Sequence, residues 1–320
     1  MMPRYQRAEI PPAMRFQERD GAILQTIYEH DGVLAKRQLK AMFWPQASQR
    51  AMEMRLSLLY HQGYLDWPSR EHWRSKPICE SVCWLGWKGI LWIAGRHGLA
   101  IESPKTTNEA QLRRLDKRLH DLGVRWVREP RWSQLQHDLA IVDFRQAVEN
   151  AVKELPTFHL ESWISEGEFL SRPDEVTYAE NGSQRQRKRK IRPDSHFTIC
   201  DERRRSQGLP ARARFLVEVD MATHDVGSFG NEKILAGLAY LHSPAYKARF
   251  EDNAGRWLVI TSGQTRLNHL ARQAQKLLGP SANAFLFTTL AQANSANVLT
   301  SRIWAGANES EPMALLSQPK

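Results

Sequence analysis

Two carboxylates in the second half of the chain have the spacing that a metal site on a strand requires. Glu218 and Asp220 alternate at the end of an apolar segment, residues 214–220, which we predict to be a buried strand. Because residues i and i+2 of a strand lie on one face, both carboxylates should point the same way. Two like charges on an apolar strand are costly unless a cation neutralises them. The pattern therefore predicts a hard divalent cation, Mg²⁺ or Mn²⁺.

Asp194 and Lys233 are the other members of this candidate site. Asp194 follows Pro193 directly after a basic run, and Lys233 lies in a predicted helix beyond the carboxylate strand. We expect Asp194, Glu218 and Asp220 to be the metal ligands, which would hold the cation against a scissile phosphate. Lys233 would stabilise charge at that phosphate or orient the attacking water. The alternative is a solvated strand face with ordinary salt bridges.

Basic residues flank Asp194 and outnumber acidic ones in the whole chain. Lys and Arg number 45 against 35 Asp and Glu, which gives a formal net charge of +10. A surplus of this size favours nucleic acid as the partner, with an anionic membrane surface as the weaker alternative. The run from Arg185 to Arg192 either guides the DNA backbone to Asp194 or is a solvated loop. Its predicted DNA-binding members are Arg187, Lys188, Arg189 and Lys190.

The composition also indicates a compartment. No apolar run approaches the roughly 18 residues of a membrane span, and residues 1–19 lack the apolar core of a signal peptide. The cysteines Cys79, Cys83 and Cys200 are odd in number, and no Cys or His pair completes a zinc-type spacing. We predict a cytoplasmic protein with reduced thiols, no membrane association and double-stranded DNA as its partner.

Periodicity in residues 19–100 predicts three helices followed by a hairpin that encloses a basic loop. The third helix begins after Ser48, a credible N-cap. This order is that of a winged helix-turn-helix, whose third helix reads DNA. The alternative is a small helical domain that contacts protein. The predicted helices are 19–30, 35–43 and 48–63, and the predicted strands are 64–67 and 82–85. The predicted DNA-binding residues are Gln49, Arg50 and Arg55 on the third helix, and Arg70, Arg74 and Lys76 in the loop.

A second alternation of helices and strands follows in residues 133–304. The predicted elements are a helix at 137–152, strands at 158–164, 193–199 and 214–220, a helix that contains Lys233 and Tyr240, and strands at 257–261 and 284–288 around a helix at 265–278.

Pro193-Asp194 followed by Glu218-Val219-Asp220 on the next strand resembles the PD-(D/E)XK nuclease superfamily. The strand motif of the superfamily ends in lysine, whereas Asp220 stands at that position here. In some members the lysine has moved to the following helix, and Lys233 would correspond to it. The resemblance implies an α+β or α/β fold class, in which an N-terminal winged helix-turn-helix precedes a restriction-endonuclease-like α/β domain. The predicted boundaries are a flexible lead at 1–18, the winged-helix domain at 19–100, a connector at 101–132, the nuclease-like domain at 133–304 and a tail at 305–320.

A further resemblance covers nearly the whole chain. Its ordered pieces are Arg19-Asp20, Arg55-Leu56-x-x-Leu59-Tyr60-x-x-Gly63-Tyr64-Leu65, Trp84-Leu85-Gly86-Trp87-Lys88-Gly89, His137-Asp138-Leu139, Asp143-Phe144, Pro193-Asp194, Phe215 to Asp220, and Lys233 ahead of Tyr240. The set is similar to the replication-relaxation family, which includes MobC-type relaxases of mobilisable plasmids. The resemblance implies action on plasmid DNA at a transfer or replication origin, and a positioning role for His137 and Asp143 at the site. From the sequence alone, a histidine such as His137 is more often a helix-surface or satisfied buried residue.

Two functions compete on these grounds. The first is a metal-dependent DNA nickase or relaxase-like nuclease, which the retained Asp194, Glu218 and Lys233 favour. The second is a DNA-binding accessory protein of replication or transfer whose nuclease-like domain has lost activity, with other replication or conjugation proteins as partners. The missing lysine at position 220 favours this one. A third function, a winged-helix regulator with a small-molecule sensor domain, is disfavoured because a sensor pocket would not need the basic clusters beside Asp194.

Overall fold

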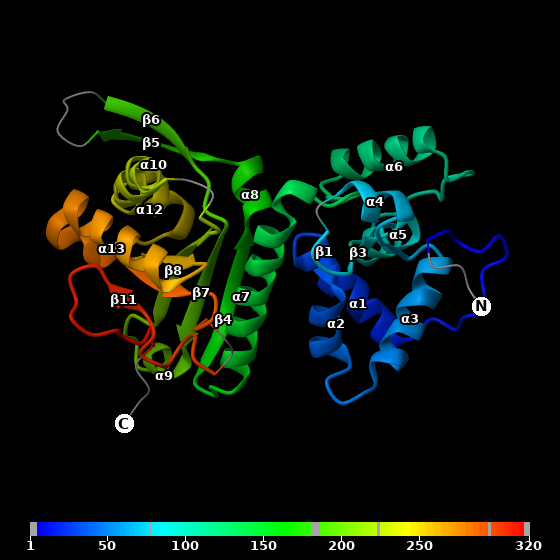
Figure 1. Ribbon diagram of the computed structural model, residues 1–320, viewed down its shortest axis with the longest axis horizontal. Helices are drawn as coiled ribbons and strands as arrows, with labels where there is room; N and C mark the ends of the chain where they lie inside the picture. The colour runs from blue at the N-terminus through cyan, green and yellow to red at the C-terminus, as the bar shows by residue number, and fades with distance from the viewer. Residues whose placement is uncertain (1–4, 77, 181–185, 223–224, 294–295, 317–320) are drawn as a thin grey trace. The chain divides into compact units, whose positions relative to one another are not determined.

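The computed structural model describes residues 5–76, 78–180, 186–222, 225–293 and 296–316. The chain divides into two compact units, Met1–Leu139 and Ala140–Lys320 (Figure 1). The division falls within one long helix, α7 (Leu135–Lys153). None of the helices in the described ranges is both long enough and apolar enough to span a membrane.

The first unit combines short strands with helices. Its elements in chain order are α1 (Glu18–Glu29), β1 (Val33–Ala35), α2 (Lys36–Phe43), α3 (Gln49–His61), β2 (Leu65–Asp66), α4 (Arg70–Ser75), β3 (Val82–Leu85), α5 (Trp87–Arg96), α6 (Glu109–Asp121) and the 3₁₀ turn η1 (Trp132–Gln134). The strands form an antiparallel sheet with the order β1-β3-β2. Ile23, Leu24 and Ile27 of α1 are fully buried, as their helical spacing predicts.

Helix α3 shows why the sequence pattern is readable here. The Ser48 hydroxyl accepts a hydrogen bond from the Ala51 N–H at 3.2 Å and so caps the first turn. Met52 and Leu56 follow on the buried face, and the chain leaves the helix at Gly63, whose φ is +84°. Glycine adopts such a φ without the steric cost of a Cβ. The predicted third helix is confirmed.

Several short elements escaped prediction. The segment between β2 and β3, predicted as a basic loop, contains α4, whose N-cap Ser69 accepts a hydrogen bond from the His72 N–H at 3.2 Å. β1 is three residues long, too short to show a period. The expected connector, residues 101–132, contains α6 and belongs to the first unit. In α6, Leu115 and Leu119 are buried on one face of an otherwise charged helix.

Arg55 is a partly buried residue that pairs with a buried acid of the first unit. Its Nε donates to Oδ1 of the fully buried Asp20 at 2.8 Å, and its Nη2 donates to the Arg15 carbonyl at 2.9 Å. Asp20 also accepts the Gln17 N–H at 2.7 Å and thereby caps α1. The prediction that Arg55 shares the exposed face of α3 with Arg50 is wrong. Helical spacing does not distinguish an exposed arginine from one that neutralises a buried acid.

We expect Arg55→Ala to lower the free energy of unfolding by roughly 3–5 kcal/mol, because the Asp20 carboxylate would stay buried without its cation. Arg50→Ala is the matched control, since it removes an exposed arginine from the same helix and should change stability by less than about 0.5 kcal/mol. Urea unfolding of the full chain, followed by tryptophan fluorescence, measures both variants. Equal stability of the two variants would contradict the interior role of Arg55.

The second unit is built on strands and helices that alternate along the chain. After α7 its elements are β4 (Phe158–Ser165), α8 (Glu166–Ser171), β5 (Asp174–Ala179), β6 (Gln186–Ile191), β7 (Ser195–Asp201), α9 (Glu202–Ser206), β8 (Arg212–Asp220), α10 (Val226–Phe229), the π-helical η2 (Gly230–Leu235), α11 (Ala236–Leu241), α12 (Pro244–Phe250), β9 (Arg256–Thr261), α13 (Gln264–Leu278), the 3₁₀ segment η3 (Gly279–Ala284), β10 (Phe285–Thr289) and β11 (Ala305–Gly306). A mixed sheet has the order β11-β10-β9-β8-β7-β4, and β5 and β6 form a separate hairpin. The α+β class and the predicted longer elements are confirmed.

The sheet separates two layers of apolar side chains. Val217 and Val219 of β8 belong to the cluster that contains α7 residues, whereas Leu216 belongs to the cluster formed with α11 and α13. Figure 1 shows the same arrangement, with α7 along one face of the sheet and α10, α12 and α13 along the other. Because side chains alternate along β8, Glu218 and Asp220 share the face of Leu216. The prediction that the two carboxylates point to one face is confirmed.

Candidate active site

Three buried carboxylates lie at one end of the β7–β8 pair. Asp194 directly precedes β7, Glu218 and Asp220 are on β8, and each of the three residues is less than a tenth exposed. The Asp194 N–H donates to the Val217 carbonyl at 3.0 Å, and the Val219 N–H donates to Asp194 Oδ2 at 2.6 Å. Asp194 is therefore held against β8 by the backbone on either side of Glu218.

Lys233 meets Glu218 from η2. Its Nζ lies 2.6 Å from Glu218 Oε1 and 2.9 Å from Oε2. Burial lowers the pKa of the Lys233 ammonium, but the carboxylates of Glu218 and Asp194 raise the pKa by more, so the group stays charged. The π-helical geometry of η2 is one that recurs at functional sites. The structure thus brings together Asp194, Glu218 and Lys233, which we call the acid–lysine cluster.

Asp220 has a cation of its own, which the sequence analysis did not identify. Arg266, in the first turn of α13, donates from Nε to Asp220 Oδ2 at 2.6 Å and from Nη2 to Oδ1 at 3.1 Å. Such bidentate pairing is among the strong forms of charge-assisted hydrogen bonding. The two residues are 46 positions apart in the chain. The sequence indicated only in general terms that a buried acid such as Asp220 would need a cation nearby. It did not indicate which residue supplies that cation.

The donor chemistry at this end of the sheet suits a hard divalent cation at two of the three acids. Asp194 and Glu218 supply carboxylate oxygens, the ligands that Mg²⁺ and Mn²⁺ prefer. Both oxygens of Asp220 are bound by Arg266. Within the described ranges, oxygens of the three acids do not all come within 4.8 Å of one another. Lys233 likewise contacts both oxygens of Glu218, so a metal there would have to replace or share that contact, whereas the Arg266 pair makes Asp220 an anchor for α13.

The basic run forms a strand. Residues 186–191 make up β6 and pair antiparallel with β5, which excludes a solvated loop for this part of the run, and Arg185 lies outside the described residues. Three of its cations have acidic partners, although Arg187, Lys188 and Lys190 are all exposed. The ion pairs are Arg187–Glu180 at 2.6 Å, Lys188–Glu175 at 3.6 Å and Arg189–Glu232 at 3.0 Å.

Arg189 connects this hairpin with the acid–lysine cluster. Its partner Glu232 directly precedes Lys233 in η2, and the positive charge of Arg189 is close enough to lower the pKa of Lys233 slightly against the larger effect of the acids. Arg189 is thus the side chain by which the hairpin adds positive charge near Lys233.

His137 and Asp143 occupy different units. His137 is near the start of α7 in the first unit, where its Nδ1 lies 3.4 Å from Asp138 Oδ1, and Asp138 binds Arg131 at 2.6 Å. Asp143 follows in the part of α7 that belongs to the second unit. The predicted positioning role of both residues at the site stays a prediction.

A cleft of about 570 Å³ lies in the first unit, next to α3. Gln49 lines it and donates to Glu53 Oε1 at 2.9 Å. Three basic residues of α2 that were not predicted, Lys36, Arg37 and Lys40, also line the cleft. Lys36 Nζ lies 4.4 Å from the centre of the Trp67 ring. Such a combination of cationic and aromatic side chains suits contact with nucleic acid.

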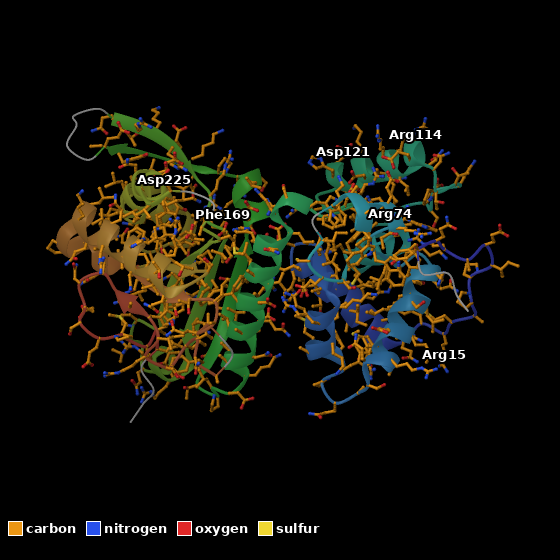
Figure 2. The ribbon with its side chains drawn as sticks, viewed as in Figure 1. Arg15, Arg74, Arg114, Asp121, Phe169 and Asp225 are labelled. Carbon is orange, nitrogen blue, oxygen red and sulfur yellow. The ribbon has the colours of Figure 1, made fainter. Side chains whose placement is uncertain are left out.

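The other predicted DNA-binding residues of the first unit lie on its surface. Arg50 of α3 is exposed, as are Arg70 and Arg74 of α4 and the following Lys76 (Figure 2, with Arg74 labelled). Within the described ranges none of these four side chains has an acidic partner, so their charge is available to a polyanion.

Fold and site together define an α+β protein with a buried acid–lysine cluster in one unit and an exposed set of arginines in the other. The family model described as replication-relaxation matches residues 24–236, and the chain belongs to this family. The match includes the acid–lysine cluster but not Arg266. No curated protein and no solved structure matches the chain. Family membership indicates a role in the replication or transfer of plasmids or mobile elements.

His196 is a buried base on the same sheet face as Glu218. Its ring stacks on Phe250 with centroids 4.1 Å apart, and neither ring nitrogen has a hydrogen-bond partner among the described residues. Burial, with smaller contributions from Arg214 and Arg249, lowers the pKa of His196 to about 3. The native state therefore holds this imidazole neutral, whereas the unfolded chain protonates it near its ordinary pKa of about 6.5.

We expect the free energy of unfolding to fall as the pH drops from about 6.5 towards 3, by up to roughly 1.4 kcal/mol per pH unit from His196 alone. The sign follows because only the unfolded state binds the proton in this window. His196→Gln should remove this part of the slope, whereas the control His269→Gln, at an exposed position of α13, should retain it. Urea unfolding at a series of pH values measures the slopes, and a His196→Gln slope equal to that of the wild type would contradict the neutral buried state.

Proposed function

We propose that the chain is a metal-dependent endonuclease of nickase or relaxase type, which processes plasmid or mobile-element DNA at an origin of transfer or replication. The observation that carries this proposal is the contact of Lys233 with Glu218 beside Asp194. Asp194 and Glu218 would be the two acids of a phosphodiester-cleaving site, and Lys233 would be its lysine. Lys233 would then replace the lysine that the nuclease motif has at the position of Asp220.

Asp194 and Glu218 would hold Mg²⁺ or Mn²⁺ in this proposal. The bound ion would supply Lewis-acid stabilisation of the phosphate and lower the pKa of a water. Lys233 keeps its charge and lies against Glu218, so it can donate to a phosphate oxygen. Asp220 acts as a positioning residue, because its pair with Arg266 ties the end of β8 to α13.

Duplex DNA is the proposed substrate, and the first unit is the proposed DNA-binding domain. The order of three helices and a β2–β3 hairpin resembles a winged helix-turn-helix, with α3 as the recognition helix. Arg50, Arg70, Arg74 and Lys76 would contact phosphates, while Gln49 at the start of α3 could reach a base edge. Arg55 has no part in this surface, because it binds Asp20.

One observation favours a second function, that of a DNA-binding accessory protein without nuclease activity. The bidentate Asp220–Arg266 pair removes one of the three expected ligands. A protein of this kind would bind DNA and other replication or conjugation proteins but would not cleave.

We expect the full chain to nick supercoiled plasmid in the presence of Mg²⁺ or Mn²⁺ and not in EDTA. Asp194→Asn and Glu218→Gln should each lower the nicking rate by roughly 100-fold or more, because each removes a proposed metal ligand. Lys233→Ala should lower the rate by roughly 10- to 100-fold while metal binding persists. Gel quantification of the open-circular product gives the rates.

Asp201→Asn is the matched control. Asp201 is a buried acid at the opposite end of β7, and its Oδ1 caps α9 by accepting the Arg204 N–H at 3.1 Å, which an asparagine can also do. This variant should nick like the wild type. DNA binding without nicking under any metal condition would favour the accessory function over the nuclease.

The proposed DNA surface makes a separate prediction about salt. The triple variant Arg70→Ala, Arg74→Ala, Lys76→Ala should reduce the slope of log affinity against log salt by roughly two to three, as three phosphate contacts are lost. A control triple with the same change in charge, Arg272→Ala, Lys276→Ala, Arg302→Ala in the second unit, should leave the slope unaltered. Fluorescence anisotropy with a labelled duplex measures both, and identical slopes for the two triples would remove α4 from the DNA surface.

A further inference from the structure

A second cluster of ligating side chains lies at the far end of β7. His159 of β4 is paired across the strands with Cys200 of β7, and Glu202 follows as the first residue of α9. One ligand atom from each residue lies within 4.8 Å of the others. Asp194 precedes the first residue of β7 and Cys200 is near its last, so the two sites are separated by roughly 20 Å along the strand.

The donor set differs in chemistry from the acid–lysine cluster. It offers an imidazole nitrogen, a sulfur and a carboxylate oxygen, a mixture that suits Zn²⁺ and related borderline ions and not Mg²⁺. No zinc-type spacing is visible along the chain, because His159 and Cys200 meet only through the register of β4 with β7. We propose that His159, Cys200 and Glu202 form a binding site for Zn²⁺, with three protein ligands and a fourth position open to water.

The contacts at this site are ones that a metal ion can replace. His159 Nδ1 lies 2.8 Å from Glu202 Oε1, and Arg205 lies 3.4 Å from the same oxygen. His159 and Glu202 are each nearly half exposed, which gives an ion a path from solvent, whereas Cys200 is buried. Three ligands from two strands and a helix would fix the edge strand β4 to β7 and to the start of α9.

The protonation state of the Cys200 thiol determines how many protons metal binding releases. Burial and the carboxylates of Glu202 and Glu161 raise the pKa of Cys200, so the thiol is protonated in the metal-free protein. Binding breaks the S–H bond, forms an S–metal bond and releases one proton to solvent. No oxidant or reductant takes part.

Co²⁺ is the probe for this site, because a thiolate ligand gives a sulfur-to-cobalt charge-transfer absorption that carboxylate sites lack. Untagged full chain, kept reduced, should develop this band and saturate at one equivalent of Co²⁺. Zn²⁺ should abolish the band and excess Mg²⁺ should not. Cys200→Ser should abolish it, and His159→Ala or Glu202→Gln should weaken Co²⁺ binding by roughly tenfold or more.

Cys83→Ser and Cys79→Ser are the matched controls, one buried and one exposed thiol of the first unit, and both should retain the band. His159→Ala alters a partly exposed side chain, so it tests the site even if Cys200→Ser fails to fold. Absence of the band in the wild type, or a band unchanged in His159→Ala and Cys200→Ser, would overturn the proposal. Neither outcome bears on nicking, because Asp194 and Glu218 are intact in all these variants.

Discussion

Neutralisation of two carboxylates on the buried face of β8 determines how the second unit is assembled. Glu218 receives its cation from η2 and Asp220 receives its cation from α13. Both cations come from helical segments that cover this face, so the ion pairs specify which residues of those segments face the strand. Removal of either partner would leave a charge buried and unpaired, which typically costs about 3–5 kcal/mol. The apolar cluster on the same face would otherwise pack against unpaired charges.

In the proposed nuclease, the same constraint would account for the absence of a lysine at position 220. An aspartate at position 220 adds a negative charge where a lysine would add a positive one, and two cations compensate. Lys233 places a cation beside Glu218, while Arg266 forms an ion pair with Asp220. In the proposed nuclease, the functions of charge stabilisation and strand anchoring are thus divided between two side chains. Arg189 adds further positive charge near Lys233 from the β5–β6 hairpin.

Sequence periodicity was sufficient for the long elements and for the shared face of Glu218 and Asp220, because these depend on local spacing alone. It was insufficient for Arg266, which is joined to Asp220 only by the fold. It also failed for Arg55, since an arginine at a helical position can face solvent or a buried acid such as Asp20. The pairing of His159 with Cys200 could not be read either, because it depends on how β4 pairs with β7, which the fold alone sets. Local patterns therefore predicted the elements, whereas ion pairs and ligand sets required tertiary structure.

Direct measurement of metal binding tests the account at its centre. Titration of the full chain with Mn²⁺, with free Mn²⁺ followed by electron paramagnetic resonance, reports binding without dependence on any DNA substrate. The account predicts a Mn²⁺ site in the wild type that is lost in Asp194→Asn and Glu218→Gln and retained in Lys233→Ala and Cys200→Ser. Equal Mn²⁺ binding by the wild type and Asp194→Asn, or no binding by either, would contradict the assignment of these acids to a metal and leave the acid–lysine cluster as a buried ion pair.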